Sequence, residues 1–314
     1  MDKIYNISVS PHVRKNISTQ SIMGDVLIAL IPVCLFGIYN FGLSALRVLV
    51  ASVTSCVVSE ILFQLITNRK VTVSDLSAAV TGVILGINLP ATVPLWIPVL
   101  GGAFAIIIVK QLFGGLGQNF MNPALAARCF LLISFASIMT NYPAVDGVSG
   151  ATPLAVVKAG GEFNLVDMFL GTHSGVIGET SVLAILAGFI YLVARKVILI
   201  RIPALYVGST VVFAALFQLI STGELPTADF LLAQAFGGGL LLGAVFMATD
   251  YVSCPVTSSG KAIYGILLGF LTAVIRTFSG SAEGVSYAII IANMVSPLIE
   301  KITVPKAFGK EGAR

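Results

Sequence analysis

About ten long apolar runs constrain what this chain can fold into more than any other feature. They lie at residues 22–39, 41–66, 74–89, 94–112, 122–139, 180–194, 202–220, 229–249, 261–278 and 285–300. A helix of roughly 20 apolar residues crosses a bilayer, so each run is a candidate transmembrane helix. Charged residues make up only 10% of the chain, against about 25% in soluble domains. The sequence therefore predicts an all-α polytopic membrane protein.

The third of these runs, 74–89, is the weakest candidate. It is short and ends at Asn88-Leu89-Pro90, and proline disfavours a helical conformation in the residue before it. Two structures fit such a segment. One is a half-helix that stops inside the membrane, and the other is a re-entrant segment.

The basic residues predict the direction of the helices, because cytoplasmic loops of membrane proteins are enriched in Lys and Arg. With the N-terminus inside, the cytoplasmic segments hold Lys3, Arg14, Lys15, Arg69, Lys70, Lys110, Arg195, Lys196, Arg201, Lys261, Lys301, Lys306, Lys310 and Arg314. Lys158 is the clear exception. We expect both termini to be cytoplasmic and loop 140–179 to lie outside. The net charge of +4 is spread over these turns, so no nucleic-acid partner is expected.

The chain also reads as two similar halves. Segment 88–125 holds Asn88-Leu89-Pro90, an apolar helix, Lys110, Phe113-Gly114-Gly115 and Asn122-Pro123, and segment 250–297 holds Asp250, Pro255, an apolar helix, Arg276, Phe278-Ser279-Gly280 and Ser296-Pro297. An odd number of spans per half would invert the second half, as in many transporters. Three parts follow: 1–139 with a first five-helix repeat, the outer loop 140–179, and 180–314 with a second repeat and the cytoplasmic tail. Chance similarity between glycine-rich membrane segments is the alternative.

The four cysteines, Cys34, Cys56, Cys129 and Cys254, form no CxxC pair. Neither an iron–sulfur cluster nor a zinc site is expected from this chain alone. Three of them lie in apolar runs, where we expect them to be small buried hydrophobic residues.

The outer loop carries the motif on which we expect the chemistry to depend. Its sequence Asp146-Gly147-Val148-Ser149-Gly150-Ala151-Thr152 resembles the Asp-x-x-Ser/Thr-Gly-Ala-Thr motif that flavin transferases recognise. These enzymes join FMN through its phosphate to the final threonine of the motif. The Thr152 hydroxyl can form that phosphoester, and the two small residues before it allow close approach to the backbone. Asp146 would serve recognition or metal binding during transfer. The plainer interpretation is a turn before a helix, with Thr152 as N-cap and Pro153 at its first position.

Other strings flank this motif. They are Gly114-Gly115-Leu116-Gly117-Gln118-Asn119-Phe120-Met121-Asn122-Pro123 and Met247-Ala248-Thr249-Asp250. With the flavin motif between them, nearly the whole chain resembles the D subunits of Rnf electron-transport complexes. It is also similar to the B subunits of sodium-pumping NADH:quinone reductases. Those subunits carry a longer N-terminal extension, which favours the Rnf family here.

The resemblance implies a complex of the prokaryotic cytoplasmic (inner) membrane that passes electrons between ferredoxin and NAD and couples them to sodium or proton movement. It implies covalent FMN at Thr152, a flavin transferase for maturation, other Rnf subunits and membrane lipid as partners, and a ten-helix fold related to urea transporters. Nothing in the chain resembles a dinucleotide-binding fingerprint, so other subunits would handle NAD and ferredoxin. The alternative function is a solute transporter or channel with the same fold and no flavin.

A second flavin site is expected in the turn between runs 94–112 and 122–139. Asn119 and Asn122 lie there beside a run of glycines, and amide side chains can match the donor and acceptor edge of an isoalloxazine ring. In the related reductase subunits a non-covalent riboflavin is expected in this region. The structural alternative is that Asn122 caps a helix that starts at Pro123.

Three charged residues close to apolar runs are weaker candidates. Glu60 and Arg128 lie near helix ends, from which long side chains can reach the interface. Asp250 is separated from Lys261 by a short turn. The two residues could pair or help gate an ion, although capping or surface exposure is the plainer role of Asp250.

Overall fold

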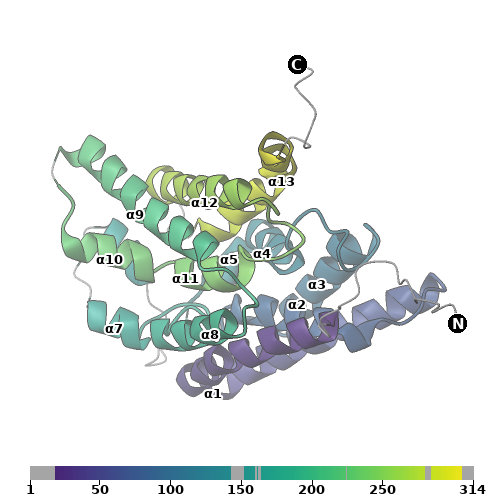
Figure 1. The fold of residues 1–314 in the computed structure, drawn as a ribbon. Helices are drawn as coiled ribbons and strands as arrows, with labels where there is room; N and C mark the ends of the chain where they lie inside the picture. The colour runs from purple at the N-terminus through teal and green to yellow at the C-terminus, as the bar shows by residue number, and fades with distance from the viewer. Residues whose placement is uncertain are drawn as a thin grey trace, which may run out of the picture.

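The structure is a computed structural model that describes residues 18–142, 152–159, 161, 164–223, 225–279 and 284–305. Within these residues every regular element is a helix (Figure 1). Four of them are long and apolar enough to cross a membrane: α1 (Thr19–Ile66), α9 (Arg201–Thr222), α12 (Ser258–Phe278) and α13 (Val285–Thr303). The chain is therefore a polytopic helical membrane protein, as predicted.

Helix α1 contains the first two predicted spans. At Gly42 the backbone has φ 64° and ψ −148°, a conformation that is essentially restricted to glycine. The helical path breaks at this residue, and the two halves of α1 run in opposite directions in Figure 1. The predicted boundary between runs 22–39 and 41–66 thus lies two residues before the observed break.

The third span is the half-helix that the sequence allowed. After the short turn η1 (Val73–Asp75), α2 (Ser77–Ile87) has 11 residues. It rises about 16 Å at 1.5 Å per residue, roughly half of the ~30 Å hydrocarbon core. The amide N–H of Gly178 donates to the Ile87 carbonyl at 2.7 Å, and that of Ile177 donates to the Leu89 carbonyl at 3.2 Å. A segment of the predicted outer loop therefore satisfies the last carbonyls of this half-helix.

Shorter apolar helices fill the other runs of the first half and the start of the second. They are α3 (Trp96–Ala103), which continues into the π-helical segment η2 (Phe104–Gln111), then α4 (Pro123–Ser134) with α5 (Ala136–Met139), and α8 (Val182–Ala194). Two short helices, α6 (Pro153–Lys158) and α7 (Leu165–Leu170), lie in the predicted outer loop.

The eighth span is broken. Helix α10 (Ala228–Phe236) ends at three consecutive glycines, after which α11 (Leu240–Leu242) and the π-helical segment η3 (Gly243–Met247) continue at an angle of 51°. Arg276 of α12 donates to the carbonyls of Gln234, Gly237 and Gly238 at 2.6, 2.8 and 3.3 Å. The guanidinium therefore satisfies carbonyls that a break inside a membrane would otherwise leave without partners.

The two halves contain a matching helix contact. In the first half Ser55 of α1 donates to the Val99 carbonyl of α3 at 2.7 Å, beside Gly102, where an added Cβ would lie 2.8 Å from the serine Oγ. In the second half Ser209 of α9 donates to the Gly265 carbonyl of α12 at 3.2 Å, and a Cβ on Gly269 would overlap Ser209. Small residues let membrane helices approach closely. This likeness is what a repeat predicts, and the inverted relation of the halves stays a prediction.

The surface of the described residues is largely apolar. Tyr39, Ile66 and Ile302 are 84%, 79% and 82% exposed. Exposed apolar side chains recur along α1, α9, α12 and α13, as expected of helices that lie in a membrane. A continuous apolar core inside joins residues of both halves, from Ala29 to Ile299.

Candidate functional site

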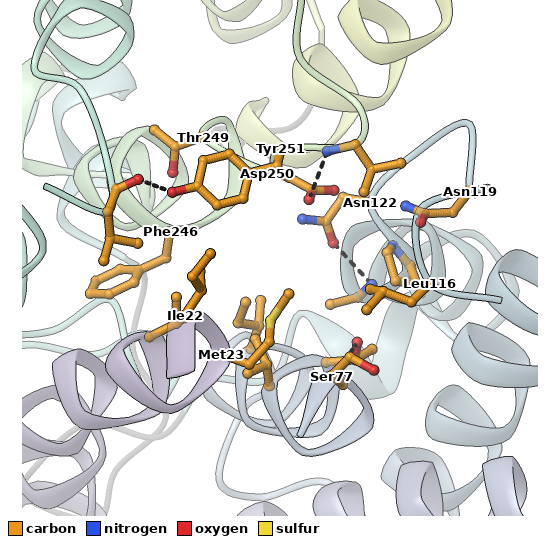
Figure 2. Close-up of a pocket in the computed structure, with 18 of the residues that line it drawn as sticks. Ile22, Met23, Ser77, Leu116, Asn119, Asn122, Phe246, Thr249, Asp250 and Tyr251 are labelled. Atoms are coloured by element: carbon orange, nitrogen blue, oxygen red, sulfur yellow. Dashed lines mark hydrogen bonds between the residues drawn. The ribbon is translucent and has the colours of Figure 1, made fainter. Parts of the chain in front are cut away.

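A mostly apolar pocket opens between the start of α1, α2, η2, the turn before α4, and the end of η3 (Figure 2). Its volume is about 100 Å³. Sites for organic cofactors have about 300–1,000 Å³, so a ligand of flavin size would enter only if side chains of the lining moved. Its polar lining includes Asn119, Asn122, Thr249 and Asp250.

Both asparagines of the predicted second flavin site line this pocket, but their side chains differ in what they bind. Asn122 caps α4, because its Oδ1 accepts from the N–H groups of Ala124 and Leu125 at 3.1 and 3.4 Å. Its Nδ2 donates to the Met247 carbonyl at 3.5 Å. The structural alternative for Asn122 is thus observed. Asn119 donates from Nδ2 to the nearby Met121 carbonyl at 2.9 Å.

Asp250 lines the same pocket from the second half of the chain, just after η3. Its carboxylate accepts from Ser253 Oγ at 3.0 Å and from the Val252 N–H at 3.4 Å, and no ion pair with Lys261 forms among the described residues. Burial raises the pKa of Asp250, and these two hydrogen bonds partly oppose the increase. The pocket therefore brings a carboxyl group that holds its proton more tightly than usual close to two amides.

A buried ion pair adjoins the pocket. Lys110 lines it, and the Lys110 Nζ lies 2.7 Å from Glu60 Oε1 and 2.6 Å from Ser77 Oγ. Glu60 is completely buried and also accepts from Gln111 Nε2 at 2.6 Å, while its Oε2 has no hydrogen-bond partner among the described residues. The expectation that Glu60 reaches the interface was wrong, because its side chain binds Lys110 and Gln111 of η2 inside the protein.

Arg128 is also buried rather than interfacial. It is 5% exposed, and its guanidinium donates to Asn88 Oδ1 at 2.8 Å. Asn88 ends the half-helix α2, so the cation lies where a helix C-terminus carries partial negative charge. Glu60 and Arg128 were singled out as charges in apolar runs, and Lys110 was counted with a cytoplasmic turn. The partners of these buried charges lie 40 to 50 positions away in the chain.

Both π-helical segments contribute to this pocket. Lys110 belongs to η2, while Val245 and Phe246 belong to η3. π-Helical turns are rare and occur frequently at functional sites. In Figure 2 the polar side chains of Asn119, Asn122 and Asp250 lie above the pocket. The side chains of Ile22, Met23 and Ser77 lie below it.

Thr152 lies at the other functional position that the sequence predicted. It is the residue before α6 and is 4% exposed, with φ −65° and ψ 149°. Its carbonyl accepts from the Val156 N–H at 3.0 Å, but its hydroxyl makes no capping hydrogen bond. Thr227 and Thr257 hold the same position before α10 and α12, and both use their hydroxyls as caps. The Thr152 hydroxyl is therefore not committed to the helix start.

The other residues of the predicted attachment motif, Asp146, Ser149, Gly150 and Ala151, lie outside the described residues. Their roles stay predictions from the sequence.

Comparison with known proteins places the chain among membrane electron-transport subunits. Residues 6–309 match the NQR2, RnfD, RnfE family. The chain is 46% identical to the D subunit of the Na⁺-translocating ferredoxin:NAD⁺ oxidoreductase complex of Acetobacterium woodii, with 96% of this chain and 95% of that protein covered. It is 39% identical to the D subunit of the proton-translocating ferredoxin:NAD⁺ oxidoreductase complex of Clostridium ljungdahlii, with 98% and 96% covered. It is 34% identical to the D subunit of the ion-translocating oxidoreductase complex of Methanosarcina acetivorans, with 97% of each covered.

Proposed function

The chain belongs to the NQR2, RnfD, RnfE family, and on that premise we propose that it is the flavin-carrying membrane subunit of an ion-translocating ferredoxin:NAD⁺ oxidoreductase complex. Its full-length relatives are named as subunits of such complexes. In this role the chain works with other subunits of the complex and is not catalytically complete alone. A bound flavin supplies one- and two-electron transfer, while the protein supplies binding, orientation and electrostatics.

The attachment site for the first flavin is Thr152. The proposal depends mainly on one observation. Thr152 is the N-cap residue of α6, but its hydroxyl makes no capping hydrogen bond. A phosphoester at that oxygen would remove no hydrogen bond from the helix start. Because Thr152 is 4% exposed, a flavin transferase must reach it before the loop packs or while the loop is open.

The pocket beside Asn119 is the proposed site of a second, non-covalent flavin. It is mostly apolar, with a few polar groups that converge on it, and its volume of about 100 Å³ means that lining side chains must move to admit the ring. Because the Asn122 amide is used in capping α4, Asn119 is the better candidate for a contact to the ring edge. Riboflavin is the ligand proposed for this pocket.

Coupling to ion movement would involve the buried pair of Glu60 and Lys110. Ionisable groups inside a membrane protein commonly mark ion or proton pathways, and Lys110 lines the pocket beside Asn119. The relatives named above differ in their ion, sodium in one case and protons in another. The proposal is therefore for coupling to sodium or proton movement, without a choice between them.

The first test is in-gel flavin fluorescence after denaturing electrophoresis. The full chain is expressed with a flavin transferase, next to Thr152→Ala, Thr152→Ser and Thr227→Ala. We expect a fluorescent band near 33 kDa in the wild type, in Thr152→Ser and in the control Thr227→Ala, which loses a threonine from the same helix position. Thr152→Ala should show no band.

The alternative function is a solute transporter or channel of the same fold without flavin. The broken eighth span and the half-helix α2 favour it, because discontinuous helices form substrate sites in transporters. If the wild-type band does not fluoresce although the transferase is active on another substrate, covalent flavin is rejected. The transporter or channel is then the favoured function.

A further inference from the structure

A polar side chain in the middle of α13 reaches the turn that carries both asparagines of the pocket. Asn293 is 1% exposed, and α13 packs against both α4 and α12 (Figure 1). The Asn293 amide nitrogen donates to the Ile289 carbonyl at 3.3 Å and to Tyr264 Oη at 2.6 Å. Its Oδ1 accepts from the backbone N–H of Asn122 at 3.2 Å. One amide therefore connects α12, α13 and the start of α4.

The turn before α4 depends on such contacts for its position, because it has no regular helical structure of its own. Three of its glycines have positive φ values: Gly114, Gly115 and Gly117. Two groups from the second half of the chain bind Asn122. Its Nδ2 donates to the Met247 carbonyl at 3.5 Å, and its backbone N–H donates to Asn293 at 3.2 Å. The second bond is shorter, and an N–H at the cap position has no partner within the helix, so Asn293 is the stronger anchor of the turn.

We propose that Asn293 and Tyr264 are positioning residues for the ligand of the pocket beside Asn119, an inference that rests on the proposed function. Neither side chain lines the pocket. Asn293 fixes Asn122, Tyr264 fixes the Asn293 amide, and Asn119 lies three residues before Asn122 in the same turn. A group that is already held in place loses less conformational entropy when it binds a ligand. A ring that contacts Asn119 therefore binds more tightly because these two residues hold the turn.

The opposite wall of the pocket differs in kind. Met23 lies below the pocket in Figure 2, facing the asparagines above it. Methionine is unbranched and adapts its shape easily, whereas the turn at Asn122 is tied to α12 and α13. Because the lining must move to admit a ring, the pocket needs one adaptable wall and one fixed wall. The bonds of Asn293 supply the fixed wall.

Polar pairs between membrane helices can also serve stability alone. Tyr206 of α9 and Thr272 of α12 form such a pair, with 2.8 Å between their hydroxyl oxygens, and both are completely buried. Neither residue lines the pocket. Tyr264 is also completely buried. Tyr206→Phe therefore removes a buried tyrosine hydroxyl, as Tyr264→Phe does, but leaves the anchor of the turn in place.

The test uses the full chain, expressed without a flavin transferase so that no covalent flavin interferes, and purified in detergent. The variants are Tyr264→Phe, Asn293→Leu and Asn293→Asp, with Tyr206→Phe as the matched control. Equilibrium dialysis measures the dissociation constant for riboflavin, and thermal unfolding measures the stability of the same samples. Expression with a flavin transferase, followed by in-gel fluorescence, tests the attachment at Thr152 separately.

We expect Tyr264→Phe to bind riboflavin about fivefold more weakly, the factor to which one net hydrogen bond corresponds. Asn293→Leu should bind at least about tenfold more weakly, because the Asn122 N–H also loses its acceptor. Asn293→Asp keeps an oxygen that can accept from this N–H, so it should bind more tightly than Asn293→Leu. Tyr206→Phe should lower the unfolding midpoint about as much as Tyr264→Phe does, but keep the wild-type dissociation constant.

Wild-type affinity in Tyr264→Phe and Asn293→Leu, or an equal loss of affinity in Tyr206→Phe, would overturn the inference, because the bonds would then serve stability alone. That result would leave the proposed riboflavin site intact. A wild-type chain that binds no riboflavin would reject the proposed ligand of this pocket and the inference with it, while a fluorescent band would still support the flavin at Thr152. If Asn293→Leu does not fold, the comparison of Tyr264→Phe with Tyr206→Phe decides by itself.

Discussion

At the scale of single residues, buried charge is the feature that sets this chain apart from a simple bundle of apolar helices. Glu60 and Lys110 are 0% and 2% exposed and form a direct ion pair. Breaking a buried pair from one side leaves an uncompensated charge, which costs about 3–5 kcal/mol. Replacing both partners by neutral groups removes that penalty.

We therefore expect Glu60→Gln to destabilise the protein by about 3–5 kcal/mol, and Lys110→Met added to it to recover much of the loss. Thermal unfolding followed by circular dichroism in detergent measures both. Arg195→Gln is the control. It breaks the ion pair with Asp25, whose arginine side chain is 54% exposed, so it should change the stability little. Equal losses in Glu60→Gln and in the double variant would show that the pair is not the source of the effect.

A second residue-scale prediction concerns pH. His173 is half-buried in the segment between α7 and α8, and burial lowers its pKa below 6.5, while hydrogen bonds to the backbone at Ser174 and Thr180 and the charge of Asp167 partly oppose this. The unfolded chain then binds a proton at pH values where the folded protein does not, so stability falls as the pH drops below about 6.5.

The measurement is the midpoint of thermal unfolding between pH 7.5 and 5.5, for the wild type and His173→Gln. We expect the difference between them to move in favour of the variant as the pH falls. A difference that does not change with pH would mean that the folded and unfolded states protonate His173 equally.

Thr152 shows the limit of residue-scale inference from sequence. A threonine followed by proline predicts an N-cap, and the residue does hold that position before α6. Whether its hydroxyl makes the capping bond depends on the local rotamer and packing, which the sequence does not specify. For Asn122, at the equivalent place before α4, the side chain does cap.

At the scale of elements, the apolar runs located the spans well, but their internal breaks were harder to predict. Pro90 and the short run allowed either the half-helix α2 or a re-entrant segment. The glycine break between α10 and α11, and the π-helical segments η2 and η3, were not predicted. Such distortions depend on neighbours such as Arg276, which satisfies the freed carbonyls from another helix.

The break in α1 provides an element-scale prediction. In both Gly42 and Gly208 of α9 an added Cβ would meet no atom within 4 Å, but only Gly42 has a positive φ, of 64°. We expect Gly42→Ala to cost about 1–3 kcal/mol because the backbone conformation is strained for alanine. Gly208→Ala should stabilise its helix by roughly 0.5–1 kcal/mol.

The stabilities of Gly42→Ala and Gly208→Ala are compared with the wild type by chemical or thermal unfolding in the same detergent. Because neither substitution creates a clash, a similar effect at both positions would contradict a role for backbone strain at Gly42.

At the scale of the whole molecule, the loop charges predict that both ends of the chain lie inside and that α6 lies outside. Alkaline phosphatase fused after residue 142 should be active, whereas fusions after residue 70 or residue 305 should be inactive and the corresponding fluorescent-protein fusions bright. The reverse pattern would invert the predicted topology and move the proposed flavin site to the cytoplasmic face.

The sequence by itself determined the class of protein, the positions of the apolar helices and the shortness of the third run, which it left as a half-helix or a re-entrant segment. These properties follow from local composition, because the free energy of transferring a segment into lipid depends mainly on its own side chains. A contiguous motif likewise singled out Thr152, and its flavin stays a proposal.

Tertiary structure alone decided which distant residues meet. It joined Glu60 to Lys110 and brought Asp250 to the pocket of Asn119. It also tied Asn122 to Asn293 of α13. These contacts depend on how helices from the two halves pack, and packing is set by the shapes and polar groups of many side chains at once. No local pattern in the sequence encodes that arrangement.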